Sequence, residues 1–343
     1  MKQEIESVES NYIWELIDLP AGCMKIGLIW VYKTKLNEKK GKIEKYKARL
    51  VAKGYGQKLG IDYNEVFAPI ARWDTIRTIL AVATCKGWKV YQLDVKSDFL
   101  HRELVEDVYV EQPLGYHKED KSKVYKLNKA LYGLRQTPRA WYSKIESYFA
   151  QSNFVKCSHE HTLFVKNNSK GRIVIVSLYV DDLIYTGDDI EMFESFKHSM
   201  QRNFAITNLG KMTYFLGVEV KQCDEGIFIS QAKYSTEILE RFGMENCNMV
   251  CNPIVIGSKL VKDENGGEVD ASKYKQIVGC LMYLLATTPD LSYSVCLVAR
   301  YLERPTEMHL SAIKRIIRYL KGTVNYGVMY KKGKKVRLTS RSD

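Results

Sequence analysis

Residues 172–186 read RIVIVSLYVDDLIYT, which is two apolar runs interrupted by two adjacent carboxylates. The apolar runs are typical of buried strands, and a polar pair between them is typical of a tight hairpin turn. We therefore expect Asp181 and Asp182 at the tip of a hairpin between buried strands. Two adjacent carboxylates in such a place repel each other, and a bound cation would remove that repulsion.

A third carboxylate, Asp94, ends another apolar strand, VYQLD (residues 90–94). Hard divalent ions such as Mg²⁺ take oxygen ligands, so Asp94, Asp181 and Asp182 form a candidate metal site. Two ions held there would suit phosphoryl transfer. The alternative is ordinary turn chemistry, because Asp tolerates turn conformations and bonds to local backbone. Spacing alone favours that alternative.

Around this hairpin the sequence mixes strand-like and helix-like patterns. We expect a basic β-hairpin from residues 30–35 and 46–52, and a strand over residues 90–95. Three-and-four apolar spacing predicts helices at residues 75–83, 140–150, 274–286 and 307–321. The last of these has one apolar face and one cationic face. A Gly/Asp/Glu-rich loop after Asn252-Pro253 marks the expected domain boundary.

The chain has 343 residues, with 52 Lys+Arg against 40 Asp+Glu and a formal net charge of +12. With 45% hydrophobic residues it can bury a sizeable core, which excludes a disordered chain. Its longest apolar stretch, residues 277–286, is too short for a membrane helix, so we expect no membrane partner. Basic residues gather at 33–58 and 314–337, which favours a nucleic acid partner. Two solvated lysine-rich faces would have the same composition.

The residues around Asp181 and Asp182 carry a more specific signal. LYVDDLIYTG (178–187) resembles the YVDD signature of reverse transcriptases from copia-type long-terminal-repeat retrotransposons. Further segments resemble this family, and they come in family order: WELIDLP (14–20), YKARLVAKGYGQKLGIDYNEVFAP (46–69), QLDVKSDFL (92–100), LYGLRQTPRAWY (131–142), YFLGVEV (214–220) and RYLKGTVNYG (318–327). The ordered series covers nearly the whole chain from about Asn11 and overturns the turn-only interpretation of Asp181-Asp182.

The resemblance implies an α+β fold of the right-hand polymerase type, with fingers, palm and thumb. It implies RNA-directed DNA polymerase activity, in which a primer 3′-hydroxyl attacks a deoxynucleotide. Asp94, Asp181 and Asp182 resemble the catalytic acids that hold two Mg²⁺ ions, with Mn²⁺ as the alternative ion. The implied partners are an RNA template, a DNA/RNA primer-template duplex and deoxynucleoside triphosphates. The implied location is a cytoplasmic virus-like particle.

Other site positions are implied by the same resemblance. Lys47, Arg49 and Lys53 lie in the fingers-like segment whose cations grip the triphosphate, and strand register decides which of them point inward. Phe99 resembles the aromatic gate that excludes a ribose 2′-hydroxyl. Two further motifs resemble the nucleotide and template contact (Gly133, Gln136 and Pro138) and the primer grip (Phe215, Leu216 and Gly217). Their plain alternatives are a Gly/Pro turn and a strand with a glycine bulge.

The chain departs from the family pattern at several positions. Asp98 stands where alanine is usual, and His101-Arg102 stands where Asn-Gly is usual. A carboxylate near the incoming triphosphate is unfavourable, so we expect Asp98 to weaken nucleotide binding. The alternative function is therefore an inactive, truncated retrotransposon remnant that only binds nucleic acid. A nuclease using the same acids is a third alternative, which Phe99 and Gly133 disfavour.

Three domains are expected. They are a reverse transcriptase over residues 12–255, a helical connection over residues 256–330 and a truncated first strand of an RNase H-like domain over residues 331–343. Asp343 resembles the first acid of the RNase H site, which needs further carboxylates from later strands. We therefore expect no RNase H activity from this chain.

Overall fold

The computed structural model describes residues 1–36, 43–95, 103–118, 120, 122–255, 257, 259–262 and 265–333. The chain divides into two compact units. The first comprises residues 1–72 and 91–210, and the second comprises residues 73–90 and 211–343. The chain therefore leaves the first unit after residue 72, adds one helix to the second, returns at residue 91, and leaves again after residue 210.

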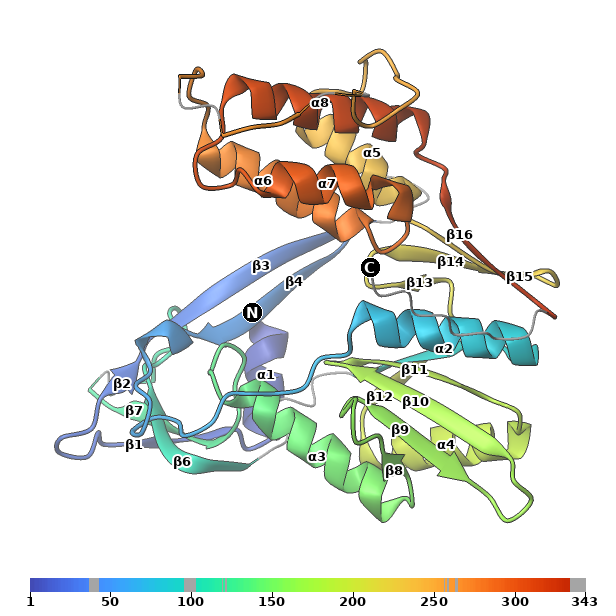
Figure 1. Cartoon of the computed structure of the whole chain (residues 1–343). Helices are drawn as coiled ribbons and strands as arrows, with labels where there is room; N and C mark the ends of the chain where they lie inside the picture. The colour runs from blue at the N-terminus through green and yellow to red at the C-terminus, as the bar shows by residue number, and fades with distance from the viewer. Residues whose placement is uncertain are drawn as a thin grey trace. The chain divides into compact units, whose positions relative to one another are not determined.

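The first unit is built around a six-stranded sheet (Figure 1). Its strand order is β12-β5-β11-β10-β9-β8. The strands are β5 (Tyr91–Val95), β8 (Val155–Lys156), β9 (Leu163–Asn167), β10 (Ile173–Tyr179), β11 (Asp182–Gly187) and β12 (Ile206–Lys211). The apolar runs of β10 and β11 pair antiparallel, with β5 on one side and β9 on the other. This places the carboxylate hairpin in the middle of the sheet.

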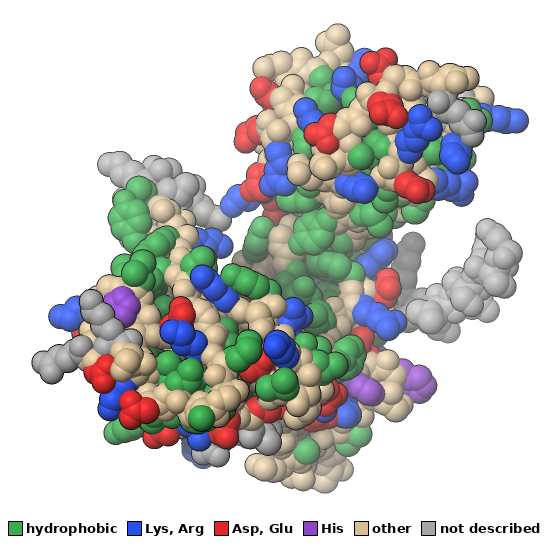
Figure 2. Space-filling view, turned by 90° about the vertical axis from the view of Figure 1, so that its left-hand side faces the viewer, with side chains coloured by type: hydrophobic (Ala, Val, Ile, Leu, Met, Phe, Trp, Pro, Cys, Tyr) green, Lys and Arg blue, Asp and Glu red, His purple; other side chains and the backbone are tan. Residues whose placement is uncertain are grey.

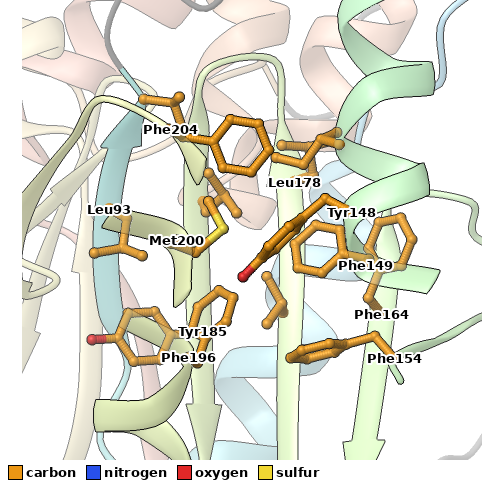
Figure 3. Packing of buried hydrophobic residues seen from close by; sticks show 14 of the residues in the cluster. Leu93, Tyr148, Phe149, Phe154, Phe164, Leu178, Tyr185, Phe196, Met200 and Phe204 are labelled. Atoms are coloured by element: carbon orange, nitrogen blue, oxygen red, sulfur yellow. The ribbon is translucent and has the colours of Figure 1, made fainter. Parts of the chain in front are cut away.

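Helices α3 (Thr137–Gln151) and α4 (Ile190–Asn203) cover this sheet with aromatic side chains. Phe149 of α3 stacks on Phe164 of β9 with ring centroids 4.4 Å apart. Tyr185 of β11 meets Phe196 of α4 edge-on at 5.5 Å. Figure 3 shows these rings interlocking between the helices and the strands. Such close packing resists displacement, so it fixes the strands that carry the candidate acids.

A second layer of the first unit holds a smaller sheet with the order β1-β7-β6-β2. Its strands are β1 (Trp14–Ile17), β2 (Lys25–Ile26), β6 (Glu103–Val110) and β7 (Val124–Lys129). The long hairpin of β3 (Leu28–Leu36) and β4 (Ile43–Ala52) comes next, and a short 3₁₀ turn at Gly54–Gly56 ends it. Helix α1 (Lys2–Ser10) packs on this layer through Ile5 and Val8, which share a core with Leu50.

The second unit combines a four-stranded sheet with a helical bundle. The sheet order is β13-β14-β15-β16, and its strands are β13 (Tyr214–Phe215), β14 (Val218–Gln222), β15 (Gly226–Ser230) and β16 (Gly327–Lys331). Its helices are α2 (Trp73–Lys86), α5 (Ala232–Arg241), α6 (Ala271–Leu284), α7 (Ser292–Ala299) and α8 (Glu307–Gly322), with a 3₁₀ turn at Pro289–Leu291. Helices α5 to α8 share one apolar core.

The predicted α+β class and the predicted helices and strands are confirmed, whereas the helices α1, α4, α5 and α7 were not predicted. The compact units divide the chain near residues 72, 90 and 210, and the expected boundary at 330 falls inside β16. The domain limits 12–255, 256–330 and 331–343 therefore stay predictions. Among the described helices none is long and apolar enough to cross a bilayer. All eight cysteines lie in the described part and are free thiols.

Candidate active site

The candidate acids lie where the β10–β11 turn meets β5. Tyr179 pairs with Asp182 across the hairpin, so the turn between the strands has two residues, Val180 and Asp181. Asp182 is also the direct register partner of Asp94 on β5. The Asp181 carbonyl accepts a hydrogen bond from the Val95 amide at 2.9 Å. The hairpin tip expected from the apolar runs is therefore confirmed, and strand pairing brings the third acid beside it.

The environment of Asp182 disfavours its charge. Burial raises the pKa of the Asp182 carboxyl, and the negative charge of Asp94 raises that pKa further. The Gln92 side-chain amide donates to Asp182 Oδ1 at 3.2 Å, which lowers the pKa and offsets part of the rise. A divalent cation would relieve the repulsion, and the carboxylate oxygens are the donors that Mg²⁺ prefers. Within the described residues no three acidic, His or Cys side chains gather closely enough to hold an ion.

The first residue of the turn is strained. Val180 has a φ of +54°, in the left-handed region that a β-branched residue rarely adopts. Its carbonyl accepts a hydrogen bond from the indole Nε1 of Trp141 at 2.8 Å. Trp141 lies on α3 and is 3% exposed. A buried side chain from another element therefore holds the turn that carries the two aspartates.

The β3–β4 hairpin supplies candidate cations on one face. Successive strand residues point to opposite faces, and Leu50 is fully buried on one of them. Lys47 and Arg49 therefore share the other face. Lys47 is exposed and is the register partner of Lys33, whereas the Arg49 guanidinium lies 4.8 Å from the ring centroid of Tyr132.

Lys53 comes directly after the end of β4 and is half-buried. Its amide donates to the Gly27 carbonyl at 2.8 Å. A Cβ built at Gly27 would lie 3.0 Å from Lys53 Cδ, so the lysine side chain runs closely along that glycine. The three predicted triphosphate ligands thus have different surroundings. Lys47 is exposed, Arg49 lies over an aromatic ring, and Lys53 packs along the backbone.

The loop that contains Gly133 packs backbone to backbone on the end of β4. Gly133 has a φ of +92°, and a Cβ there would lie 2.2 Å from the Ala52 carbonyl oxygen. The Ala52 amide donates to the Tyr132 carbonyl at 2.7 Å. A side chain at this position would push the loop off the hairpin. The family resemblance implied that Gly133 contacts nucleotide and template, and in the structure this glycine packs closely on the protein's own backbone at Ala52.

Gln136 is 5% exposed, and both ends of its side-chain amide are bonded within the protein. Its Nε2 donates to the Asp62 carbonyl at 2.9 Å, and its Oε1 accepts from Gln57 Nε2 at 3.0 Å. The Gln57 side chain in turn accepts a bond from the Arg135 amide at 2.8 Å. Gln136 therefore ties the 57–62 loop to the start of α3. These two bonds use one N–H and one lone pair of the amide and hold the side chain within the protein.

Comparison with known proteins decides the family. The family described as reverse transcriptase (RNA-dependent DNA polymerase) matches residues 11–256. The chain belongs to this reverse transcriptase family. It is 39% identical to a retrovirus-related Pol polyprotein from transposon RE1 of Arabidopsis thaliana, over 100% of this chain and 23% of that protein. It is 38% identical to the corresponding polyprotein from transposon TNT 1-94 of Nicotiana tabacum, over 94% of this chain and 25% of that protein.

The chain spans about a quarter of the length of these two polyproteins. A solved structure of a foamy viral protease-reverse transcriptase in complex with double-stranded DNA is similar with a TM-score of 0.49 and 12% identity, covering 94% of this chain and 47% of that chain. Membership in the reverse transcriptase family confirms the resemblance that the YVDD segment and its neighbouring motifs indicated.

The reverse transcriptase motif predicted as primer grip lies in the second unit. Phe215 is fully buried, and Leu216 and Gly217 form the two-residue turn between β13 and β14. Their φ angles are +48° and +75°. The Tyr283 hydroxyl of α6 donates to the Leu216 carbonyl. The plain alternative, a strand with a glycine bulge, is thus wrong, because this glycine lies in a hairpin turn with two left-handed residues.

The basic face of α8 is occupied by the chain itself. Arg318 Nε donates to the Asn248 carbonyl at 2.7 Å, Arg315 donates to the Asn252 side chain, and Lys321 donates to the Glu245 carbonyl. On the face drawn in Figure 2, basic and acidic side chains are interspersed over the helical part of the second unit. These three cations bind the 245–252 segment, which weakens the argument that this basic cluster marks a nucleic acid footprint.

Several predicted positions of the reverse transcriptase site lie outside the described residues. They are Phe99, Asp98, His101, Arg102 and Asp343. Conversely, the sequence analysis missed Gln92 and Trp141. Gln92 stands two residues before Asp94, so strand periodicity puts both on one face and could have found it. Trp141 has helical core spacing, and nothing in that spacing indicates its bond to Val180.

Proposed function

We propose that this chain is an RNA-directed DNA polymerase that extends a primer on an RNA template with deoxynucleoside triphosphates. The observation that carries the proposal is the register pairing of Asp182 with Asp94, next to the Asp181 turn. In the reaction the primer 3′-hydroxyl loses its proton and forms a bond to the α-phosphate. The bond between the α- and β-phosphates breaks, and pyrophosphate leaves.

Asp94, Asp181 and Asp182 would hold two Mg²⁺ ions, or Mn²⁺, where the β10–β11 turn meets β5. Ions in this position would make the 3′-hydroxyl more acidic and stabilise charge on the departing pyrophosphate. Gln92 orients Asp182 by its hydrogen bond to Oδ1 at 3.2 Å. The β5–β11 pairing keeps the Asp94 and Asp182 carboxylates close together although they repel each other. This repulsion destabilises the fold, so we attribute the arrangement to function.

The cationic face of the β3–β4 hairpin suits the triphosphate and the template backbone. Lys33 and Lys47 are direct cross-strand partners, and like charges directly opposite destabilise a sheet. Arg49 lies on the same face as Lys47. Such cations attract a polyanion and stabilise charge that develops during phosphoryl transfer. We assign Lys47, Arg49 and Lys53 to this role, with Phe99, Gly133 and Gln136 near the nucleotide.

The test is primer extension on a defined RNA template with Mg²⁺ and deoxynucleotides at fixed salt. The chain is compared with its Asp181→Asn/Asp182→Asn variant. The matched control is Asp188→Asn/Asp189→Asn, which makes the same change at the other end of β11. Asp189 is the N-cap of α4, and Asn caps a helix about as well as Asp.

Extension that is abolished in the first variant and kept in the control supports the polymerase. Equal extension by all three proteins would disprove the role of Asp181 and Asp182. If no protein extends the primer but all bind primer-template, the inactive nucleic-acid-binding remnant replaces the polymerase as the function. The affinities of the three proteins for primer-template must be compared at one salt concentration, because phosphate contacts weaken steeply with salt.

A further inference from the structure

The turn between β10 and β11 has a conformation that its sequence does not favour. Its two central residues are Val180 and Asp181, and only Val180 has a positive φ, at +54°. A two-residue hairpin turn with positive φ at its first central residue is of type II′, which favours glycine there. A valine in that place costs on the order of 1–2 kcal/mol relative to an ordinary backbone conformation.

Tertiary hydrogen bonds hold both carbonyls of this turn. The Val180 carbonyl accepts from Trp141 Nε1 at 2.8 Å, and the Asp181 carbonyl accepts from the Val95 amide at 2.9 Å. Because the Asp181 bond belongs to β5, the Trp141 bond is the one that comes from outside the sheet. It acts on the strained residue itself.

The Trp141 ring is itself fixed in place. It is 3% exposed on α3 and meets Phe204 edge-on, with ring centroids 5.7 Å apart. The adjacent Tyr142 hydroxyl donates to the His161 carbonyl at 2.7 Å, which anchors the same turn of α3. A donor this well anchored can select one turn conformation over its competitors.

We propose that Trp141 is a positioning residue for the polymerase reaction. Its indole N–H holds Val180 in the left-handed conformation and so sets the direction of the Asp181 and Asp182 carboxylates. The inference rests on the proposed function, because it assigns a role in orienting those acids. The competing interpretation is that Trp141 only fills the core, as its helical spacing alone would suggest.

The two interpretations differ in what a Phe replacement does. Trp141→Phe keeps an aromatic ring and removes the N–H. Trp14→Phe is the matched control, because Trp14 is 9% exposed in the same unit and its indole nitrogen has no hydrogen-bond partner among the described residues. Core filling predicts similar effects of the two replacements, and positioning predicts a specific effect at Trp141.

The decisive variant removes the strain as well. In Trp141→Phe/Val180→Gly the glycine adopts the left-handed conformation without help. We expect Trp141→Phe to lower kcat in primer extension at least about tenfold, with the affinity for primer-template unchanged, and the double variant to regain most of the loss. Trp14→Phe should keep kcat within about twofold. A tenfold change corresponds to about 1.4 kcal/mol.

A second measurement does not depend on activity. With ¹⁵N-aspartate labelling, Trp141→Phe should shift the amide signals of Asp181 and Asp182 and leave those of Asp188 and Asp189 in place. If primer extension itself fails in the unaltered chain, the proposed function fails, and these shifts still decide whether Trp141 holds the turn.

Three outcomes would overturn the proposal. They are unchanged Asp181 and Asp182 signals in Trp141→Phe, a kcat loss that Val180→Gly does not relieve, and an equal loss in Trp14→Phe. If Trp141→Phe does not fold, folding of the double variant supports the proposal, and its failure to fold shows that Trp141 is needed for the core generally.

Discussion

Two hairpin turns in this protein each hold a bulky apolar residue in a left-handed conformation, and they differ in the residues around it. The Val180-Asp181 turn of the first unit and the Leu216-Gly217 turn of the second are each two residues long. Each places a bulky apolar residue at positive φ, +54° for Val180 and +48° for Leu216. In each, the carbonyl of that residue accepts a hydrogen bond from an aromatic side chain on a helix, Trp141 or Tyr283.

The two turns differ in the residue that comes directly after the bulky one. Leu216 precedes a glycine with a φ of +75°, as a type I′ turn favours, whereas Val180 precedes two carboxylates. The first turn therefore combines backbone strain with charge repulsion, and the second relieves part of its strain with Gly217. Strain and repulsion together are typical of a site that selection keeps for chemistry rather than for stability.

Truncating the residue before each turn should give the largest effects. Phe215 is 1% exposed, while Tyr179 is only half-buried. We expect Phe215→Ala to cost about 3–5 kcal/mol of unfolding free energy, because it leaves a cavity in the core. Tyr179→Ala should cost clearly less. Urea unfolding measures both, and equal losses would remove the contrast between a structural turn and a reactive one.

Replacing the glycine of the second turn by valine, and the valine of the first turn by glycine, should give the next largest changes in stability. Gly217→Val introduces left-handed strain, and a Cβ there would lie 2.6 Å from the Tyr283 hydroxyl. We expect a loss of about 2–3 kcal/mol. Val180→Gly relieves strain but adds about 0.5–1 kcal/mol of chain entropy, so stability should stay within about 1 kcal/mol. A loss at Val180→Gly as large as at Gly217→Val would show that the first turn is not strained.

Local patterns in the sequence predicted both hairpins but not their tertiary support. The apolar runs beside Asp181-Asp182 define β10 and β11, and the segment YFLGVEV contains β13 and β14. The pairing of β11 with β5 joins residues about 90 positions apart, and no local pattern encodes that register. Its place at the end of an apolar strand made Asp94 a candidate for the third acid, and the family resemblance overturned the plain-turn interpretation of Asp181-Asp182.

The basic clusters show a further limit of sequence reasoning. Charge counts treat residues 33–58 and 314–337 alike, yet Arg315 and Arg318 bind the 245–252 segment while Lys47 remains exposed. A count of cations cannot distinguish a side chain that bonds a neighbouring carbonyl from one that faces solvent. The structure is needed to distinguish cations that bond to the chain itself from cations on a surface that can bind a polyanion.

Asp182 should make the first turn sensitive to pH in a way that the second is not. Its pKa in the folded protein is raised by burial and by Asp94, so the folded state binds the proton more tightly than the unfolded state. The stability gained is fully present below about pH 3.9 and is lost as the pH rises through the raised pKa. In EDTA at neutral pH, Asp182→Asn should therefore raise Tm by a few degrees, as measured by calorimetry.

The control for that measurement is Asp188→Asn, because Asp188 accepts a bond from the Ile173 amide at 2.8 Å and lies 3.6 Å from Arg172. This change should leave Tm unchanged or lower it. A fall in Tm for Asp182→Asn at neutral pH would show that the fold stabilises the Asp182 charge, and the asymmetry between the two turns would lose its electrostatic part.

The smallest effect should come from the second aromatic donor. Tyr283 is 37% exposed, so water can replace its hydroxyl at the Leu216 carbonyl when Tyr283→Phe removes it. Gly217 also keeps the turn favourable without the bond. We expect a loss below about 1 kcal/mol, at the low end for a protein hydrogen bond. Trp141 is buried and bonds to a valine with positive φ, so the same kind of deletion there leaves the strain of the turn without its support. If Tyr283→Phe cost as much stability as Trp141→Phe, the bonds would be equivalent, and burial rather than strain would explain why an aromatic donor stands at each turn.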